Sequence, residues 1–200
     1  NAGLTVAGVY TYPGHGWAAG AAEGAARDQA EALRRAAASL RAVGIAPRIV
    51  SAGSTPTARF SATDGITEIR PGEYVFYSMD HFHHGVCSAE EIAMFVATTV
   101  VSDGHGDTQI VDAGTMTLGR EVDARGRYGW IAGDECPLSR LNEYHGFLLV
   151  EDRPRYPVGM MLPLVPNHAC TVVQNTRELF VLEPDGSCVC YPVSSFNPRG

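Results

Sequence analysis

Residues 4–12 have the sequence LTVAGVYTY, a β-rich apolar run that ends in the turn sequence PGHG at residues 13–16. Residues 23–43 are rich in Ala, Leu, Arg and Glu, which predicts a helix that stops before Gly44. Residues 47–51 predict a second short strand. Strand, helix and strand in this order form a βαβ unit, so the first third of the chain predicts part of a parallel sheet or barrel.

The rest of the chain is dominated by predicted strands. Residues 67–69 and 73–77 predict a strand pair split by a Pro-Gly turn, and the His-rich segment 81–87 predicts a loop. Short β-rich runs between Gly and Pro turns then recur, which is typical of a β domain. These runs lie at residues 92–102, 109–112, 128–131, 147–151, 160–165, 179–183 and 189–193. We therefore predict an α/β part over residues 1–85 and a β domain over residues 86–200.

The predicted parallel sheet is incomplete. A βαβ fragment that begins on a strand, with no partner strand before it, leaves one edge exposed and its apolar faces half covered. The chain also does not begin with Met. We therefore expect about the first half of a barrel to lie upstream of Asn1.

Composition argues against several classes of function. The 200 residues carry a net charge of −7 with no basic stripe, which argues against a nucleic-acid partner but not against an anion held by local donors. The apolar run at residues 158–165 is broken by Pro163 and is too short to span a membrane. Five cysteines, an odd number, favour reduced thiols in a cytoplasmic protein.

The absence of lysine has a chemical consequence. All 15 basic residues other than His are Arg. No side chain of this chain can therefore form an internal Schiff base with a carbonyl cofactor.

Two loops contain residue types that suit an anionic cofactor. The sequence SAGSTPT at residues 51–57 follows a predicted strand, and its small residues let backbone N–H groups approach an anion. In residues 68–77, Gly72 can offer an N–H to phosphate, and Arg70 can contact a cofactor ring or a carboxylate. Plain turns, the second with an exposed Arg, are the alternatives.

A candidate metal site lies in the sequence VPNHAC at residues 165–170. His168 and Cys170 are two positions apart, so both side chains would point to the same side of an extended segment. Both are good ligands for zinc, and two protein ligands would leave positions open for water or substrate. A buried Cys beside a capping His is the alternative.

Three lesser features contain similar residue types. The histidines of residues 81–84 are either ligands or a solvated cluster. Cys188 and Cys190 repeat the two-residue spacing on a predicted strand, where core or edge positions are expected. Glu143 and His145 could act as a general acid and base or orient another group, although a surface ion pair would look the same.

Together and in this order, the motifs resemble the family of D-serine dehydratase and D-threonine aldolase, which are fold-type III pyridoxal-phosphate enzymes related to alanine racemase. The matching stretches cover nearly the whole chain, and their combination is specific. They are VYTYPGHGW (9–17), SAGSTPT (51–57), TEIRPGEYVFY (67–77), FVATTVVS (95–102), IVDAG (110–114), EYHG (143–146) and VPNHAC (165–170).

The resemblance implies a fold and a set of site residues. Residues 1–85 would be the latter part of a (β/α)8 barrel like that of alanine racemase, and residues 86–200 a D-serine dehydratase-like β domain with the metal site. Glu143 and His145 would be catalytic, and His168 and Cys170 would bind a divalent metal, either zinc or manganese. The implied pyridoxal-phosphate-binding residues are Tyr12, His15, Gly53, Ser54, Thr55, Arg70, Gly72 and Tyr77.

The resemblance also implies a homodimeric lyase that acts on D-amino acids with a β-hydroxyl. The Schiff-base lysine would lie on the first barrel strand, in the missing N-terminal segment, so this chain alone should be inactive. The metal would bind the β-hydroxyl as a Lewis acid. The His-x-Cys pair favours a D-serine dehydratase-like reaction. A D-threonine aldolase-like reaction and a non-catalytic pyridoxal-phosphate or metal-binding module are the alternatives.

Overall fold

The computed structural model describes residues 3–194 of the protein and divides into two compact units. Unit 1 contains residues 3–75 and His81–Ser88, and unit 2 contains Phe76–Asp80 and residues 89–194. The change of unit therefore takes place across residues 76–88, around the boundary predicted after residue 85. In the part of the chain that is described, no helix is both long and apolar enough to cross a membrane.

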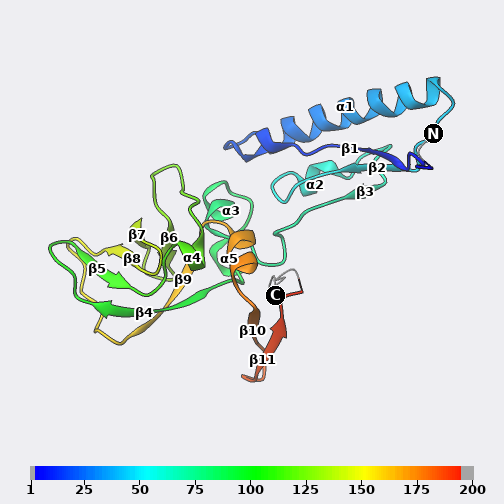
Figure 1. Ribbon diagram of the computed structural model, residues 1–200. Helices are drawn as coiled ribbons and strands as arrows, with labels where there is room; N and C mark the ends of the chain where they lie inside the picture. The colour runs from blue at the N-terminus through cyan, green and yellow to red at the C-terminus, as the bar shows by residue number, and fades with distance from the viewer. Residues whose placement is uncertain (1–2, 195–200) are drawn as a thin grey trace. The chain divides into compact units, whose positions relative to one another are not determined.

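Unit 1 is built on a three-stranded parallel sheet with the order β1-β2-β3 (Figure 1). Its strands are β1 (Gly8–Tyr10), β2 (Ile49–Ala52) and β3 (Glu68–Ile69). The helix α1 (Ala22–Ala42) connects β1 to β2, which confirms the predicted βαβ unit. β1 approaches β2 so closely that a Cβ on Gly8 would lie 1.9 Å from the carbonyl oxygen of Ile49.

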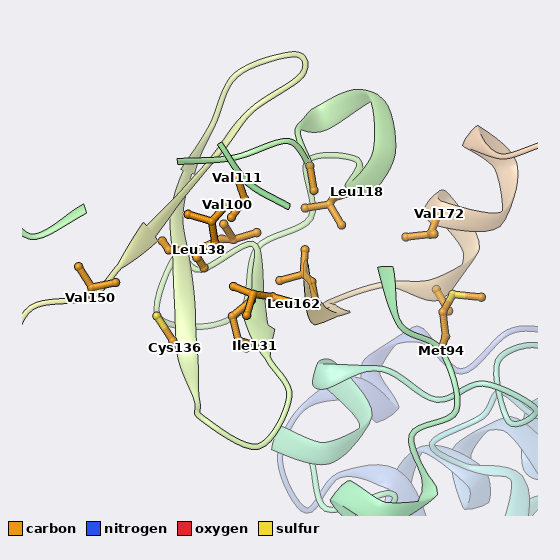
Figure 2. Packing of buried hydrophobic residues seen from close by; sticks show 14 residues of the cluster. Met94, Val100, Val111, Leu118, Ile131, Cys136, Leu138, Val150, Leu162 and Val172 are labelled. Atoms are coloured by element: carbon orange, nitrogen blue, oxygen red, sulfur yellow. The ribbon is translucent and has the colours of Figure 1, made fainter. Parts of the chain in front are cut away.

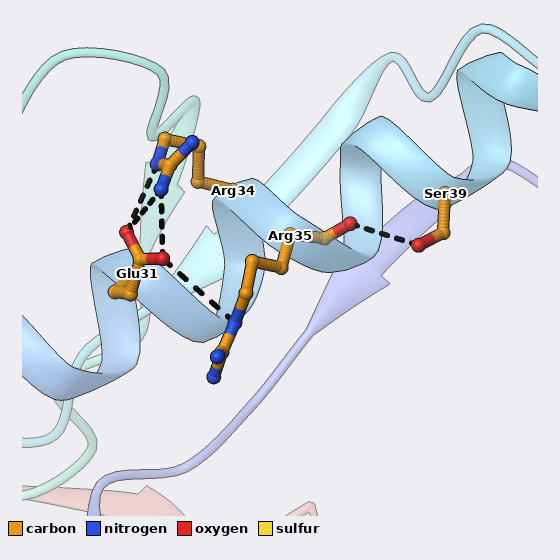
Figure 3. Close-up of polar contacts among 4 residues, drawn as sticks. All are labelled: Glu31, Arg34, Arg35 and Ser39. Atoms are coloured by element: carbon orange, nitrogen blue, oxygen red, sulfur yellow. Dashed lines mark hydrogen bonds and ion pairs between the residues drawn. The ribbon is translucent and has the colours of Figure 1, made fainter.

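The two faces of α1 differ in polarity, as expected for a helix that covers a sheet. Its buried face consists of Ala25, Ala26, Gln29, Leu33 and Ala37. Leu33 packs with Val50 and Ala52 of β2 in a small core. On the exposed face, Glu31 bonds Arg34 at 2.6 Å and pairs with Arg35 at 3.8 Å, and the bond from Arg34 lowers the pKa of Glu31 (Figure 3).

The segment after β3 corrects two predictions. Residues 73–77 do not form a strand, because the N–H of Glu73 donates to the hydroxyl of Thr55 and Tyr77 has a left-handed φ of 52°. The predicted loop at residues 81–87 instead begins inside the short helix α3 (Met79–His83). The other short helical elements are η1 (Gly14–Trp17), α2 (Ala58–Ser61) and η2 (Ala89–Glu91).

Unit 2 is built on a closed antiparallel barrel with the order β4-β5-β8-β7-β6-β9, in which β9 pairs back to β4. Closure leaves no free strand edge along the barrel. The strands are β4 (Val96–Ser102), β5 (Thr108–Val111), β6 (Gly129–Ile131), β7 (Cys136–Leu141), β8 (Gly146–Leu149) and β9 (Met161–Pro166). The sequence prediction missed β7, because its sequence CPLSRL contains a proline and no β-branched residue.

The barrel is filled by aliphatic side chains from facing strands (Figure 2). Val100, Val111, Leu138, Leu148 and Leu164 have no exposed surface. The core extends to α4 (Thr115–Leu118) and α5 (Ala169–Asn175) through Leu118 and Val172. A separate hairpin of β10 (Glu178–Leu182) and β11 (Cys188–Pro192) follows.

Candidate cofactor and metal sites

The loop after β2 is buried and internally bonded. Gly53 has φ +87°, a conformation that favours glycine, and an added Cβ would lie 3.3 Å from the Cβ of Ile69. The N–H of Ser54 donates to the hydroxyl oxygen of Thr57 at 3.0 Å, and the Ser61 hydroxyl donates to the Thr57 carbonyl at 2.9 Å. These bonds fix the path of the chain from Gly53 into α2.

Gln29 of α1 completes this network, and the sequence prediction did not find it. Its Oε1 accepts a 2.9 Å hydrogen bond from the N–H of Gly53, and its Nε2 donates to the Ser61 hydroxyl at 3.3 Å. The sequence does contain a signal for this role. Gln29 lies four positions after Ala25 and four before Leu33, so it is a polar residue on the apolar stripe of the predicted helix.

Two N–H groups of the predicted phosphate site are available to a ligand. Among the residues that the structure describes, the N–H groups of Thr55 and Gly72 donate no hydrogen bond. They belong to neighbouring loops, because Glu73, next to Gly72, donates its own N–H to the Thr55 hydroxyl oxygen at 2.9 Å. An added Cβ on Gly72 would meet nothing within 4 Å, so the space beside it is open.

Arg70 and Tyr12 are held near the carboxyl ends of the parallel strands. Arg70 donates from Nε to the Ser51 hydroxyl at 2.7 Å and from Nη2 to the Thr11 carbonyl at 2.8 Å. Tyr12 is exposed, and its hydroxyl accepts a 2.9 Å bond from the indole N–H of Trp17.

Two further predicted residues, His15 and Tyr77, lie outside the loop sequence. His15 contacts Asp28 of α1 at 3.2 Å on an exposed surface, and Tyr77 belongs to unit 2. His81, in contrast, is fully buried, with Nε2 3.8 Å from Oε2 of Glu73. The solvated alternative is therefore wrong for His81, while His83 is exposed as that alternative expects.

The predicted metal ligands lie at the start of α5 in unit 2. His168 is the N-cap with extended backbone, whereas Cys170 lies in the helix, so the prediction of one extended segment is wrong. A ring nitrogen of His168 and the Sγ of Cys170 nevertheless lie within 4.8 Å of each other. His168 is half-buried and Cys170 is exposed, which leaves the pair accessible.

The chain before α5 is anchored by Asn167. Its Nδ2 donates to the carbonyl of Glu121 at 3.2 Å and also bonds the carbonyl of Arg127. The Glu121 carboxylate in turn accepts a 3.0 Å bond from the Thr171 hydroxyl. These contacts hold the peptide that precedes His168.

Glu143 and His145 lie on an exposed turn between β7 and β8. Neither side chain makes a hydrogen bond or an ion pair with the described part of the chain. Their backbone carbonyls instead accept bonds from Met116 and Asn142, which ties the turn to the start of α4. The structure does not bring the two side chains together as an acid–base pair.

Two family models match successive parts of the chain. The "Alanine racemase, N-terminal domain" matches residues 1–80, and the "Putative serine dehydratase domain" matches residues 93–182. The D-threo-3-hydroxyaspartate dehydratase of Delftia sp. is 35% identical over 92% of this chain and 55% of its own length. This chain belongs to the family of D-serine dehydratase and D-threonine aldolase.

Other members show a similar relationship. The D-serine dehydratase of Dictyostelium discoideum is 24% identical over 96% of this chain and 53% of its own length. The D-threonine aldolase of Arthrobacter sp. is 32% identical over 64% of this chain and 34% of its own length. The chain thus spans about half the length, or less, of these family members.

The solved structure of the Delftia dehydratase has a similar fold. It superposes with a TM-score of 0.84 at 31% identity, over 93% of this chain and 55% of the other. Two variants of that dehydratase have also been solved, one with a histidine and one with a cysteine two positions later replaced by alanine. The cysteine variant is in the metal-free form.

Proposed function

We propose that this chain is the C-terminal part of a pyridoxal-phosphate- and divalent-metal-dependent lyase that acts on D-amino acids with a β-hydroxyl. One observation carries the proposal. His168 and Cys170 have the spacing of the histidine and cysteine that were replaced in the Delftia dehydratase, and their donor atoms lie within 4.8 Å here.

The donor set of this pair suits a catalytic metal. An imidazole nitrogen and a thiolate sulfur are zinc ligands, and two protein ligands leave positions open for water or substrate. We propose zinc for this site, with manganese as the alternative. His168 and Cys170 would hold the ion where it acts as a Lewis acid on the β-oxygen of the substrate.

Unit 1 has groups that fit a phosphorylated cofactor. The N–H groups of Thr55 and Gly72 can donate to the phosphate, and Gly53 holds the loop in a left-handed conformation. Tyr12 and Arg70 lie at the strand ends, where they can contact the cofactor ring. When bound, pyridoxal phosphate supplies an electron sink for the bond that breaks at the substrate α-carbon.

The cofactor requires a lysine that this chain does not contain. We propose that the lysine comes from an N-terminal segment that also completes an eight-stranded barrel. The sheet of unit 1 supports this, because within residues 3–194 β1 pairs with β2 alone, and Val6, Tyr10 and Ile49 are exposed on an open surface beside it.

A metal at this site would have a catalytic role only if the substrate carries a β-hydroxyl. An elimination needs charge stabilised on the leaving oxygen, and a retro-aldol cleavage needs the hydroxyl oriented for deprotonation. A racemase exchanges only the α-proton. The His-x-Cys pair and the similarity to the Delftia dehydratase favour elimination.

In the deciding experiment, the full-length protein is loaded with pyridoxal phosphate and zinc. It is then assayed separately with D-serine, D-threonine and D-threo-3-hydroxyaspartate as substrates. Pyruvate and ammonia from D-serine would support the dehydratase, whereas glycine and acetaldehyde from D-threonine would support the aldolase. Metal-independent racemisation of alanine, with no consumption of a hydroxy amino acid, would overturn the proposal. Removal of the metal with a chelator is the matched control.

A further inference from the structure

The buried face of α1 carries one uncharged amide among small and aliphatic side chains. Gln29 is only 3% exposed, and its neighbours on the stripe are Ala25 and Leu33. Burying an amide without hydrogen-bond partners costs folding free energy, so the hydrogen bonds of Gln29 are needed to offset its burial. An apolar side chain of the same length would satisfy the packing alone.

Both ends of the Gln29 amide are used, and both lead to the loop after β2. Oε1 accepts from the N–H of Gly53 at 2.9 Å, and Nε2 donates to the Ser61 hydroxyl at 3.3 Å. Ser61 donates in turn to the Thr57 carbonyl at 2.9 Å. Gln29 therefore spans the loop from its first residue to the helix that follows it.

This arrangement decides which N–H groups of the loop can meet an anion. The N–H of Gly53 is bound to Gln29, and the N–H of Ser54 is bound to Thr57. Gly53 and Ser54 therefore shape the loop, and their backbone donors are not available for the phosphate. The available N–H groups are those of Thr55 and Gly72.

We propose that Gln29 is a positioning residue for the phosphate of the cofactor. By holding the N–H of Gly53 toward α1, it fixes the left-handed turn that presents the Thr55 N–H to the anion. The Thr55 hydroxyl oxygen is itself fixed by the N–H of Glu73 at 2.9 Å. This inference rests on the proposed function, because it takes the ligand of the loop to be pyridoxal phosphate.

The test replaces Gln29 in the full-length holoenzyme. Gln29→Met keeps the length and volume of the side chain but removes both hydrogen bonds. The readouts are the dissociation constant of pyridoxal phosphate, the ³¹P resonance of the bound phosphate and the metal content. We expect the dissociation constant to rise about tenfold or more, with a shifted ³¹P resonance and unchanged metal content.

A matched control separates positioning from general loss of stability. Thr67 exchanges hydrogen bonds with the backbone of Val50 in the same sheet, and none of its hydrogen bonds in the described chain goes to residues 53–57. Thr67→Val should therefore lower the thermal midpoint while leaving the cofactor affinity and the ³¹P resonance unchanged. If Gln29→Met does not fold, Ser61→Ala removes the partner of Nε2 and should weaken cofactor binding by a smaller factor.

The outcomes distinguish this inference from the proposed function. A wild-type protein that binds pyridoxal phosphate, together with a Gln29 variant of unchanged affinity and ³¹P resonance, would overturn the inference alone. Equal affinity losses in Gln29→Met and Thr67→Val would also overturn it, since the effect would then follow stability. A wild-type protein that does not bind pyridoxal phosphate would overturn both.

Discussion

Asp112, the first residue after β5, and Thr99 of β4 bond each other twice. The N–H of Thr99 donates to Oδ1 of Asp112 at 2.7 Å, and the N–H of Asp112 donates to the carbonyl of Thr99 at 3.1 Å. The β4–β5 register shifts between Val100 and Ser102, next to this pair. The carboxylate thus binds a backbone donor where the strand pairing is irregular.

The pair predicts a pH dependence of stability. Partial burial acts to raise the pKa of Asp112, but the hydrogen bonds from Thr99 and Thr98 outweigh it and lower the pKa. The carboxylate therefore stabilises the fold above the ordinary Asp pKa of about 4, and this is lost as the pH falls through the lowered folded-state pKa.

We expect Asp112→Asn to unfold at lower temperature than the wild type at pH 7, by an amount that corresponds to about 1 kcal/mol or less. The difference should shrink as the pH falls from about 4 toward 2. Asp152→Asn is the control, because Asp152 is exposed and accepts no hydrogen bond within the described chain. A difference that grows with acid would contradict this interpretation.

Gly53→Ala should destabilise unit 1 and weaken cofactor binding. Alanine at φ +87° costs about 1–2 kcal/mol, and the new Cβ would also crowd Ile69. Gly65→Ala is the matched control, since Gly65 has the same φ but nothing within 4 Å of an added Cβ. Chemical unfolding should show a larger loss for Gly53→Ala, and only that variant should bind pyridoxal phosphate less tightly.

His168→Ala and Cys170→Ala in the full-length protein should each lose the divalent metal. The reason is that each removes one of the two donors that lie together at the start of α5. Elemental analysis should show a metal content far below that of the wild type, and lyase turnover should fall more than cofactor binding. Cys188→Ala, an exposed thiol on the separate hairpin, should keep its metal. Retention of both metal and activity in His168→Ala would refute the assignment.

The 200-residue chain mixed with pyridoxal phosphate and borohydride should not gain a stoichiometric side-chain adduct. It has no lysine, and arginine stays protonated at neutral pH. Mass spectrometry of the digested product checks this, with the full-length protein as the positive control. Labelling of the α-amine of Asn1 would be adventitious, whereas an adduct at any side chain would count against the need for an upstream lysine.

Much of the fold follows from local sequence patterns. The helix α1 is found within one residue of its predicted ends, because Ala, Leu, Arg and Glu favour a helix and Gly44 stops it. The barrel strands with β-branched residues, such as β4, were also predicted. β7 and α5 were missed, since the first is a strand by pairing with β6 and β8 and the second follows a proline-rich strand.

Parts of the candidate sites were likewise predicted from local sequence, and other parts were not. Residue types alone indicated His168 and Cys170 and the loop at residues 51–57. The pairing of Glu73 with a buried His81 and the use of the Gly53 N–H by Gln29 were not predicted. Each of these contacts needs a partner that the chain path, and not the local pattern, brings close.

Three features follow from the amino-acid sequence alone: the βαβ unit, the family, and the absence of a lysine for the cofactor. Each of these features depends on residue identity or on patterns a few residues long, so none of them requires knowledge of the tertiary structure. In contrast, the availability of the loop N–H groups and the proximity of the ligand atoms are visible only in the folded structure. Those depend on burial and on hydrogen bonds between residues such as Gln29 and Gly53, which are 24 positions apart.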